Sequence, residues 1–206
     1  MLSRQVLRFR SRSLVFIFII CAVANMPSAS ALIVPAVKRH TATVIMAHGL
    51  GDSGAGWVGL AENWRRRQKF EEVKFIFPNA PPIPITVDET GILRSQQYFH
   101  DLIKTEIESG IPSDRIVLGG FSQGGAMALW SGTTNPTKLG GIIGLSCYLP
   151  LRNKFKTSIP EGNPNKDTPI FMCHGDSDPL VRPQWGQMSA ELLTSNGYNV
   201  KFKLYP

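Results

Sequence analysis

A serine between two glycines stands where a strand-like run meets a helix-like run. Residues 120–124 read Gly-Phe-Ser-Gln-Gly, which is a G-x-S-x-G pattern. The run 115–120 (RIVLGG) predicts a strand, and the run 123–130 (QGGAMALW) predicts a buried helix. A nucleophile elbow requires this context, because its strained turn exposes the hydroxyl while glycines let the neighbouring backbone approach. The pattern predicts that Ser122 is a nucleophile and that the Gln123 N–H stabilises an oxyanion.

A second glycine-rich turn follows an earlier strand-like run. Residues 48–57 read HGLGDSGAGW, and Gly49, Gly51 and Gly54 form G-x-G-x-x-G. That spacing is found in dinucleotide-binding turns, but they expect an acid at the end of the next strand, where this chain has Phe77-Pro78-Asn79. A turn of backbone amides here can instead supply a second oxyanion donor, and the Leu50 N–H is the candidate.

An orienting acid is available, whereas a general base is not evident. Asp176 and Asp178 both follow the strand-like run 169–173 and come after the serine in the chain order that such a triad requires. All four histidines precede Asp178, so none occupies the position of the base, and His100, in a polar helical segment, is expected to face solvent. His174 with the two acids could imitate a metal site, but no second histidine or cysteine lies at ligand spacing. We expect neither a metal nor a cofactor.

Short apolar runs alternate with segments of helical period along residues 41–206. Strands are predicted at 41–49, 73–81, 114–122, 140–150, 169–176 and 199–206, and helices at 92–109, 123–131 and 184–195. This alternation predicts a single α/β domain whose mostly parallel central sheet carries helices on both faces. Active residues in such folds lie beyond the carboxyl ends of the strands, where the glycine and acid clusters fall.

The formal charge of +7 does not indicate a nucleic-acid partner. Four arginines within residues 1–31 contribute to it, and without them the charge is +3. The run 65–69 is read as a solvated helix face, because no aromatic platform accompanies it. Residues 1–31 combine these arginines with the apolar run 14–24 and an A-x-A site at 29–31, as a secretory signal peptide does. A transit peptide, or a true start at Met26, are the alternatives.

Several blocks of the sequence resemble the acyl-protein thioesterase/lysophospholipase group of α/β-hydrolases. They are LIVPA, HGLGDSGAGW, FPNAP, GIPSDRIVLGGFSQGGAMAL, LSCYLPLR and HGDSDPLV, spread over residues 32–206. The resemblance implies a serine hydrolase that removes palmitoyl groups from S-acylated proteins, with activity on lysophospholipids and carboxylic esters. It also implies that Ser122 is the nucleophile, Asp178 the triad acid, and Leu50 and Gln123 the oxyanion donors. A cytoplasmic protein with at most peripheral membrane contact is expected, or a secretory one if residues 1–31 are a signal peptide.

Two departures from that family affect the expected activity. Family members carry additional residues between the equivalents of Val87 and Asp88, which are adjacent in this chain. Family members also continue past the final strand through a Gly-containing loop that bears the triad histidine, and this loop does not follow the final strand here. We therefore expect the hydrolase domain, residues 32–206, to lack the C-terminal histidine loop and helix. Severely reduced turnover is the consequence. The alternatives are a non-catalytic lipid- or protein-binding module, or a truncated product of the same fold.

Overall fold

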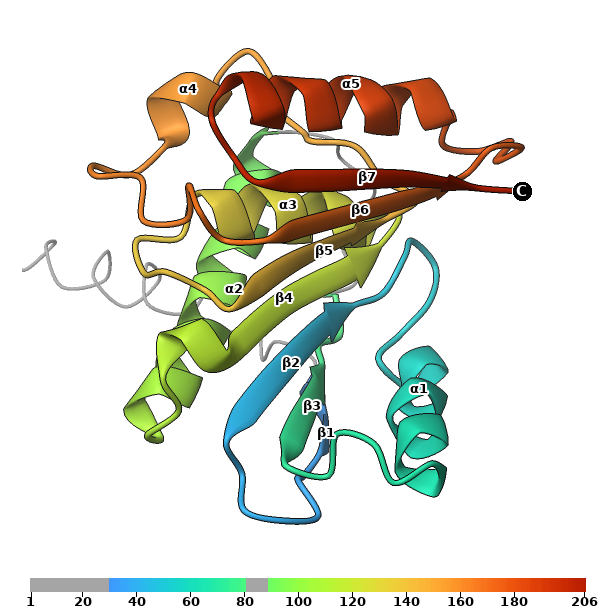
Figure 1. Ribbon diagram of the computed structural model, residues 1–206, viewed down its shortest axis with the longest axis vertical. Coiled ribbons are helices and arrows are strands. Elements are labelled where there is room, and N and C mark those ends of the chain that lie inside the picture. The colour runs from blue at the N-terminus through green and yellow to red at the C-terminus, as the bar shows by residue number, and fades with distance from the viewer. Residues whose placement is uncertain (1–29, 81–88) are drawn as a thin grey trace, which may run out of the picture.

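The computed structural model describes residues 30–80 and 89–206, which form one sheet with helices packed on it (Figure 1). Residues 1–29 of the leader and the junction between Val87 and Asp88 lie outside these residues. The strands are β1 (Leu32–Val34), β2 (Ala42–Ala47), β3 (Val73–Phe77), β4 (Ile116–Phe121), β5 (Gly141–Leu145), β6 (Ile170–Gly175) and β7 (Val200–Tyr205). The helices are α1 (Ala55–Arg66), α2 (Glu89–Glu108), the 3₁₀ turn Ser113–Arg115, α3 (Gln123–Thr133), α4 (Phe155–Ser158) and α5 (Pro183–Ser195).

The seven strands follow the order β1-β3-β2-β4-β5-β6-β7. All neighbouring pairs are parallel except β1 with β3, where Leu32 pairs with Phe77 in an antiparallel register. Parallel strands need long crossovers, and helices supply them here. The carboxyl ends of β2, β4, β5 and β6 therefore meet at one edge of the sheet. This edge is where the sequence places the serine and the candidate acids.

Each face of the sheet has its own apolar cluster, because alternate side chains of a strand point to opposite faces. Ile45 and Leu118 point toward the larger cluster, which includes Trp130 of α3 and Leu193 of α5. Val44 and Met46 point the other way, toward the cluster that contains Ala61 of α1. The predicted arrangement, a mostly parallel sheet with helices on both faces, is confirmed.

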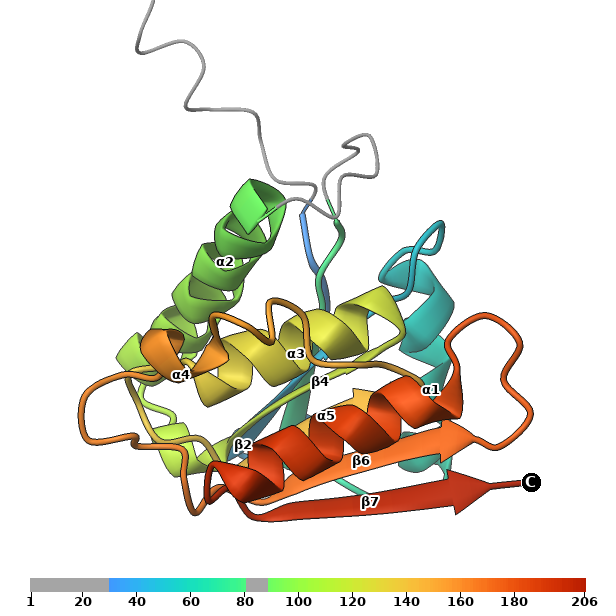
Figure 2. The ribbon, with the colours of Figure 1, turned by 90° about the horizontal axis from the view of Figure 1, so that it is seen from above.

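The helix α3 is the most deeply buried element of the fold. All of its residues from Gly124 to Thr133 are buried, which its small and apolar sequence allows. Figure 2, seen from above, shows α3 and α5 lying over the sheet on the same side. Because α3 is buried along its length, its first residues and the turn that precedes them are held against the carboxyl end of the sheet.

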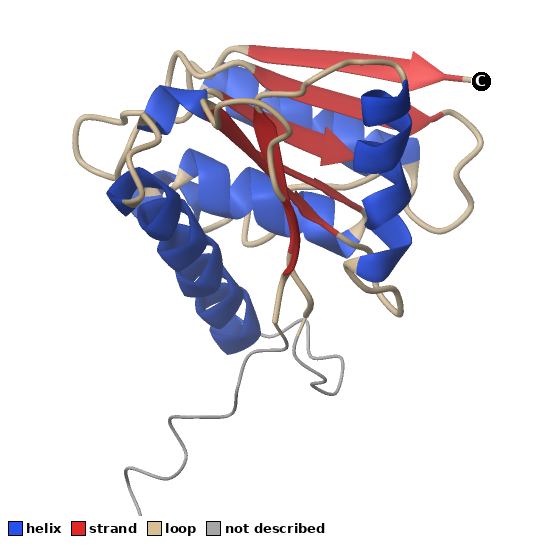
Figure 3. Cartoon of the chain, turned by 90° about the horizontal axis from the view of Figure 1, so that it is seen from below, coloured by secondary structure: helices blue, strands red, loops and turns tan. Residues whose placement is uncertain are grey.

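Most of the expected elements lie within a few residues of their predicted ends. The helix predicted at 92–109 begins at Glu89, three residues earlier than expected. The short antiparallel β1 is not among the predicted strands, because three residues carry too little periodicity to indicate one. Figure 3 shows the strands with helices on either side of them. Within the residues that the structure describes, no helix is long and apolar enough to span a bilayer.

Candidate active site

Ser122 occupies a sharp turn between β4 and α3. Its backbone has φ 53° and ψ −119°, a left-handed conformation that residues other than glycine rarely adopt. The turn is held at both ends, because the Ser122 N–H donates to the Leu145 carbonyl (2.8 Å) and the Ala126 N–H donates to the Ser122 carbonyl (2.9 Å). Strain of this kind persists only where the surroundings enforce it, and it commonly marks functional positions.

The two glycines of the motif are required by close backbone contacts. A Cβ on Gly120 would lie 2.3 Å from the Gly124 carbonyl group. A Cβ on Gly124 would lie 2.4 Å from the His48 carbonyl oxygen and 2.5 Å from that of Ala47. Helix α3 therefore begins in direct contact with both β4 and the end of β2. Only glycine at both positions permits the turn that presents Ser122.

The turn after β2 lies beside Ser122, as the sequence predicts. A Cβ on Gly49 would meet the Phe121 ring at 3.2 Å and the Ser122 Cβ at 3.4 Å. Leu50 follows Gly49 with its side chain 59% exposed, and Gln123 follows Ser122 as the first residue of α3. The structure thus gathers the serine and the residues of both candidate oxyanion donors at the carboxyl edge of β2 and β4.

Two residues that the sequence did not single out hold this glycine-rich turn. Asn79, just beyond β3, accepts a hydrogen bond from the Gly54 N–H (2.7 Å) and donates one to the Ser30 carbonyl (2.8 Å). Both His48 ring nitrogens bond backbone groups, one in Gly49 and the other in Ala80. Because the Gly54 amide already has the Asn79 partner, the turn is not an open phosphate cradle. No local sequence pattern predicts the contact between Gly54 and Asn79, which lie 25 residues apart.

Asp178 is fixed in the loop after β6 by backbone amides. Its Oδ1 accepts hydrogen bonds from the N–H groups of Leu180 (2.9 Å) and Val181 (3.0 Å). Burial alone would raise the pKa of this carboxyl, but the two amides, together with His174 and the Ser146 hydroxyl, lower it below its usual value. The carboxylate is therefore kept ionised. Asp176, by contrast, is exposed.

Each of the four histidines is bonded away from Ser122. His174 is almost fully buried, and its Nε2 donates to the Val181 carbonyl (2.7 Å) while lying 3.6 Å from the Asp178 Oδ2. His100 donates to the Ser131 carbonyl (2.8 Å), and burial lowers its pKa, so its expected solvent-facing position is wrong. His40 bonds the side chain of Thr43, near the start of β2 (2.9 Å). None of the described histidines hydrogen-bonds the Ser122 hydroxyl.

The loop that carries Asp178 and the turn that carries Ser122 are separated by two strand spacings. Ser122 follows β4 and Asp178 follows β6, with β5 between them. At about 4.8 Å per strand, the bases of the two loops are about 10 Å apart. The two loops therefore lie on either side of the end of β5, at the same edge of the sheet.

Exposed apolar side chains gather at the same edge of the sheet. Phe121 is 40% exposed and lies 5.9 Å from the Trp57 ring, measured between centroids. Leu180, beyond β6, is 85% exposed, and the exposed Trp185 ring contacts Tyr148 with a centroid distance of 5.9 Å. These exposed side chains, which we call the apolar rim, suit a ligand with a hydrocarbon chain.

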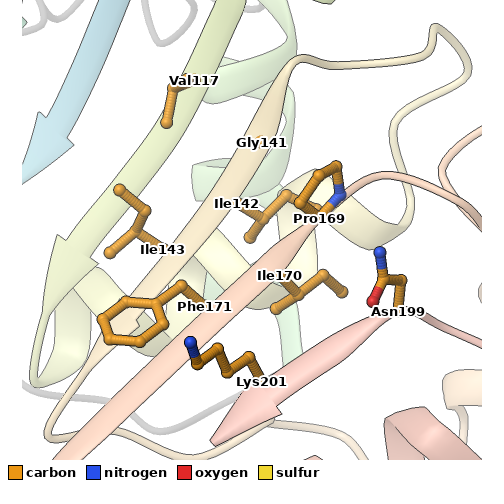
Figure 4. Close-up of a pocket in the computed structure, with 9 residues that line it drawn as sticks. All are labelled: Val117, Gly141, Ile142, Ile143, Pro169, Ile170, Phe171, Asn199 and Lys201. Carbon is orange, nitrogen blue, oxygen red and sulfur yellow. The ribbon is translucent and has the colours of Figure 1, made fainter.

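A separate hollow lies over the first halves of β4, β5, β6 and β7. It has a volume of about 400 Å³ and is lined by residues that include Val117, Ile143, Phe171 and Lys201 (Figure 4). These residues belong to the amino-terminal and middle parts of their strands, so this hollow is not part of the Ser122 site. Within the described residues, no group of three His, Cys, Asp or Glu side chains is arranged to hold a metal ion.

A mostly parallel sheet with a serine at a strained strand–helix turn defines an α/β-hydrolase. The chain belongs to the phospholipase/carboxylesterase family, whose model matches residues 28–91 and 85–206. It is 54% identical over 210 residues to an acyl-protein thioesterase 1 of Neurospora crassa, covering 89% of this chain and 86% of that one. A relative of the same name from Emericella nidulans is 53% identical over 207 residues, with 86% and 87% covered.

Solved structures agree with this assignment. The acyl-protein thioesterase 2 of Zea mays superimposes with a TM-score of 0.72 at 30% identity, covering 85% of this chain and 88% of that one. SOBER1 of Arabidopsis thaliana gives a TM-score of 0.73 at 28% identity, with 81% and 89% covered. The α/β-hydrolase fold expected from the sequence is confirmed.

Proposed function

We propose that the protein is a serine hydrolase that removes long-chain acyl groups, such as palmitate, from S-acylated proteins. The observation that carries the proposal is the strained Ser122 turn, at φ 53°, placed directly beside Gly49. The high identity to proteins named acyl-protein thioesterase supports the substrate class, and the exposed apolar rim supports a hydrocarbon chain. Lysophospholipids and carboxylic esters present the same carbonyl chemistry and are secondary substrates.

In this mechanism the Ser122 Oγ attacks the thioester carbonyl carbon, and the carbonyl oxygen becomes an oxyanion. The N–H groups of Leu50 and Gln123 donate hydrogen bonds to it, the second from the start of a helix whose dipole favours negative charge. The carbon–sulfur bond breaks and the thiol leaves with a proton. Water then attacks the acyl-serine and releases the fatty acid.

The proton of Ser122 requires a base, and an imidazole placed between Ser122 and Asp178 would supply it. The ionised Asp178 would orient such an imidazole and stabilise its cation. Because all four histidines are bonded elsewhere, we expect slow turnover from these residues alone, with about a thousand- to ten-thousand-fold acceleration over water remaining.

The test measures thiol release from a palmitoyl-cysteine peptide by the purified chain, with and without added imidazole. After the rate of hydrolysis by imidazole without protein is subtracted, we expect imidazole to raise the rate of the wild type but not of Ser122→Ala. Ser195→Ala is a matched control, because Ser195 lies at the far end of α5 and bonds only the Leu192 carbonyl. A wild-type rate equal to that of Ser122→Ala under both conditions refutes the proposal.

A non-catalytic acyl-binding module is the second candidate, and the engagement of all four histidines favours it. It predicts that a fluorescent palmitate analogue binds the wild type and Ser122→Ala with equal affinity, while imidazole produces no turnover.

We propose the cytoplasm as the location, with at most peripheral contact with membranes. The basis is the family alone.

A further inference from the structure

The peptide group between Gly49 and Leu50 is held from its carbonyl side by two donors. The His48 Nδ1 lies 2.7 Å from the Gly49 oxygen, and the Asp52 N–H donates to the same oxygen at 3.2 Å. A trans peptide is planar, and its C=O and N–H point in opposite directions. Fixing the Gly49 oxygen therefore fixes the direction of the Leu50 N–H, which is the candidate oxyanion donor.

Backbone groups also determine which ring nitrogen of His48 carries the proton. The Ala80 N–H lies 3.0 Å from Nε2 and can only donate, so Nε2 must accept. The Gly49 oxygen can only accept, so Nδ1 must carry the hydrogen. The imidazole is therefore neutral in this arrangement. It links the chain just beyond β3 to the turn that follows β2.

We propose that His48 is a positioning residue, which aims the Leu50 N–H at the oxyanion through its Nδ1 hydrogen bond to the Gly49 carbonyl. Gly49 is buried against Phe121 and the Ser122 Cβ, so the peptide has little room to move as a whole. Rotation of the peptide plane is the remaining freedom, and the His48 bond restrains it. The inference rests on the proposed function, because the oxyanion forms only during acyl transfer.

Two conservative variants separate the two bonds of the ring. The side-chain amide of Asn can take the place of Nδ1, so His48→Asn keeps the donor to Gly49 and loses the acceptor for Ala80. His48→Gln does the reverse, because its longer side chain reaches the Nε2 position. Complete loss of an oxyanion donor lowers kcat about a hundred- to a thousand-fold, and a misdirected donor loses part of that. We expect kcat to fall about ten- to a hundred-fold in His48→Gln and less than about fivefold in His48→Asn, with KM changed less than about threefold in both.

The kinetic test uses the full chain with added imidazole, and His100→Gln is the matched control. His100 bonds the Ser131 carbonyl, away from Ser122, so that substitution should leave kcat unchanged. Equal losses in the two His48 variants overturn the proposal, and so does a kcat that follows thermal stability across them. A raised KM at constant kcat would also overturn it.

A second measurement does not depend on turnover. Long-range ¹H–¹⁵N NMR of the full chain at neutral pH reports which nitrogen of His48 is protonated. We expect the Nδ1–H form, and a Leu50 amide signal that moves in His48→Gln but stays in place in His48→Asn. A protonated Nε2, or a Leu50 signal insensitive to both variants, overturns the positioning role. A wild type no more active than Ser122→Ala refutes the proposed function instead, and the NMR result still decides the role of His48.

Discussion

Adding one methyl group to Gly124 tests whether the start of α3 and the end of β2 must touch. The new Cβ would lie 2.4 Å from the His48 oxygen, whereas ordinary contact begins near 3.4 Å. Repulsion dominates at so short a contact, so the helix and the strand would have to move apart by about 1 Å. Both neighbouring oxygens belong to the backbone, so no side-chain rotation can relieve the contact. Gly124→Ala must displace either Ser122 or the turn that begins at His48.

The expected effects on stability and on activity differ in kind. Overpacking of a tight interior site costs about 1–3 kcal/mol, which lowers the melting temperature by about 2–12 °C in a chain of this size. A displacement of about 1 Å in a catalytic constellation lowers the rate about a hundred-fold. Because the displacement falls between Ser122, the proposed nucleophile, and the turn that carries the candidate oxyanion donor Leu50, we expect the rate to drop by more than the loss of folded protein explains.

Thermal unfolding and thioester hydrolysis with added imidazole, both on the purified chain, check this. Gly59→Ala is the matched control, because Gly59 also lies within a helix but a Cβ there meets nothing within 4 Å. Removing a glycine from an exposed helix interior stabilises by about 0.5–1 kcal/mol. A Gly124→Ala protein with wild-type melting temperature and wild-type rate would refute the contact. A lower melting temperature with an unchanged rate per folded molecule would refute its link to the site.

The remaining predictions concern titratable and buried groups. Because the pKa of Asp178 is lowered in the folded state, the ionised carboxylate stabilises the fold above about pH 4, and this stability is lost as the pH falls through the folded-state pKa. Asp178→Asn should therefore be less stable than the wild type at neutral pH and equally stable in acid. Glu106→Gln leaves Lys74 without its buried partner (2.5 Å) and should cost about 3 kcal/mol in urea unfolding, the lower end for such pairs because Lys74 is partly solvated. Burial raises the thiol pKa of both Cys147 and Cys173, but Cys147 is 1% exposed, so iodoacetamide should modify Cys173 in the native chain and Cys147 only on unfolding.

Each of these three predictions has a control, in which the substituted residue is more exposed or interacts with the group under test. Asp176→Asn should not change the pH dependence of stability, because that carboxylate is exposed. Glu108→Gln removes an exposed pair with Lys104 (3.7 Å) and should cost less than about 1 kcal/mol. Lys203 lowers the Cys173 pKa, so Lys203→Gln should slow alkylation of Cys173. An equal alkylation rate for Cys147 and Cys173 in the native chain would contradict the burial argument.

The turn at Ser122 was predictable because everything it needs is local in sequence. The motif, the strand before it and the helix after it lie within 20 residues, and glycine at 120 and 124 signals close packing. The proximity of Gly49 to Ser122 was also predictable, because adjacent parallel strands end at the same edge. Local pattern and sheet topology together locate the candidate site. Its roles in catalysis remain predictions.

Contacts between distant polar residues were not predictable. Glu106 is 2% exposed and accepts hydrogen bonds from Thr43 (2.7 Å) and Lys74, residues 63 and 32 positions away in the chain. His100 was expected to face solvent, but it bonds the backbone of α3. Periodicity indicates which face of an element is apolar, and it does not indicate which polar side chain finds a buried partner across the fold.

The end of β2 connects both halves of the candidate catalytic apparatus through backbone atoms. The carbonyl oxygens of Ala47 and His48 form the surface against which Gly124 packs, and so they position the helix that carries the Gln123 N–H. The His48 ring bonds the next carbonyl along the chain, that of Gly49, and so orients the Leu50 N–H. A shift of this strand end therefore changes both candidate oxyanion donors together. The two N–H groups come from separate elements, yet one short segment of backbone sets the distance between them.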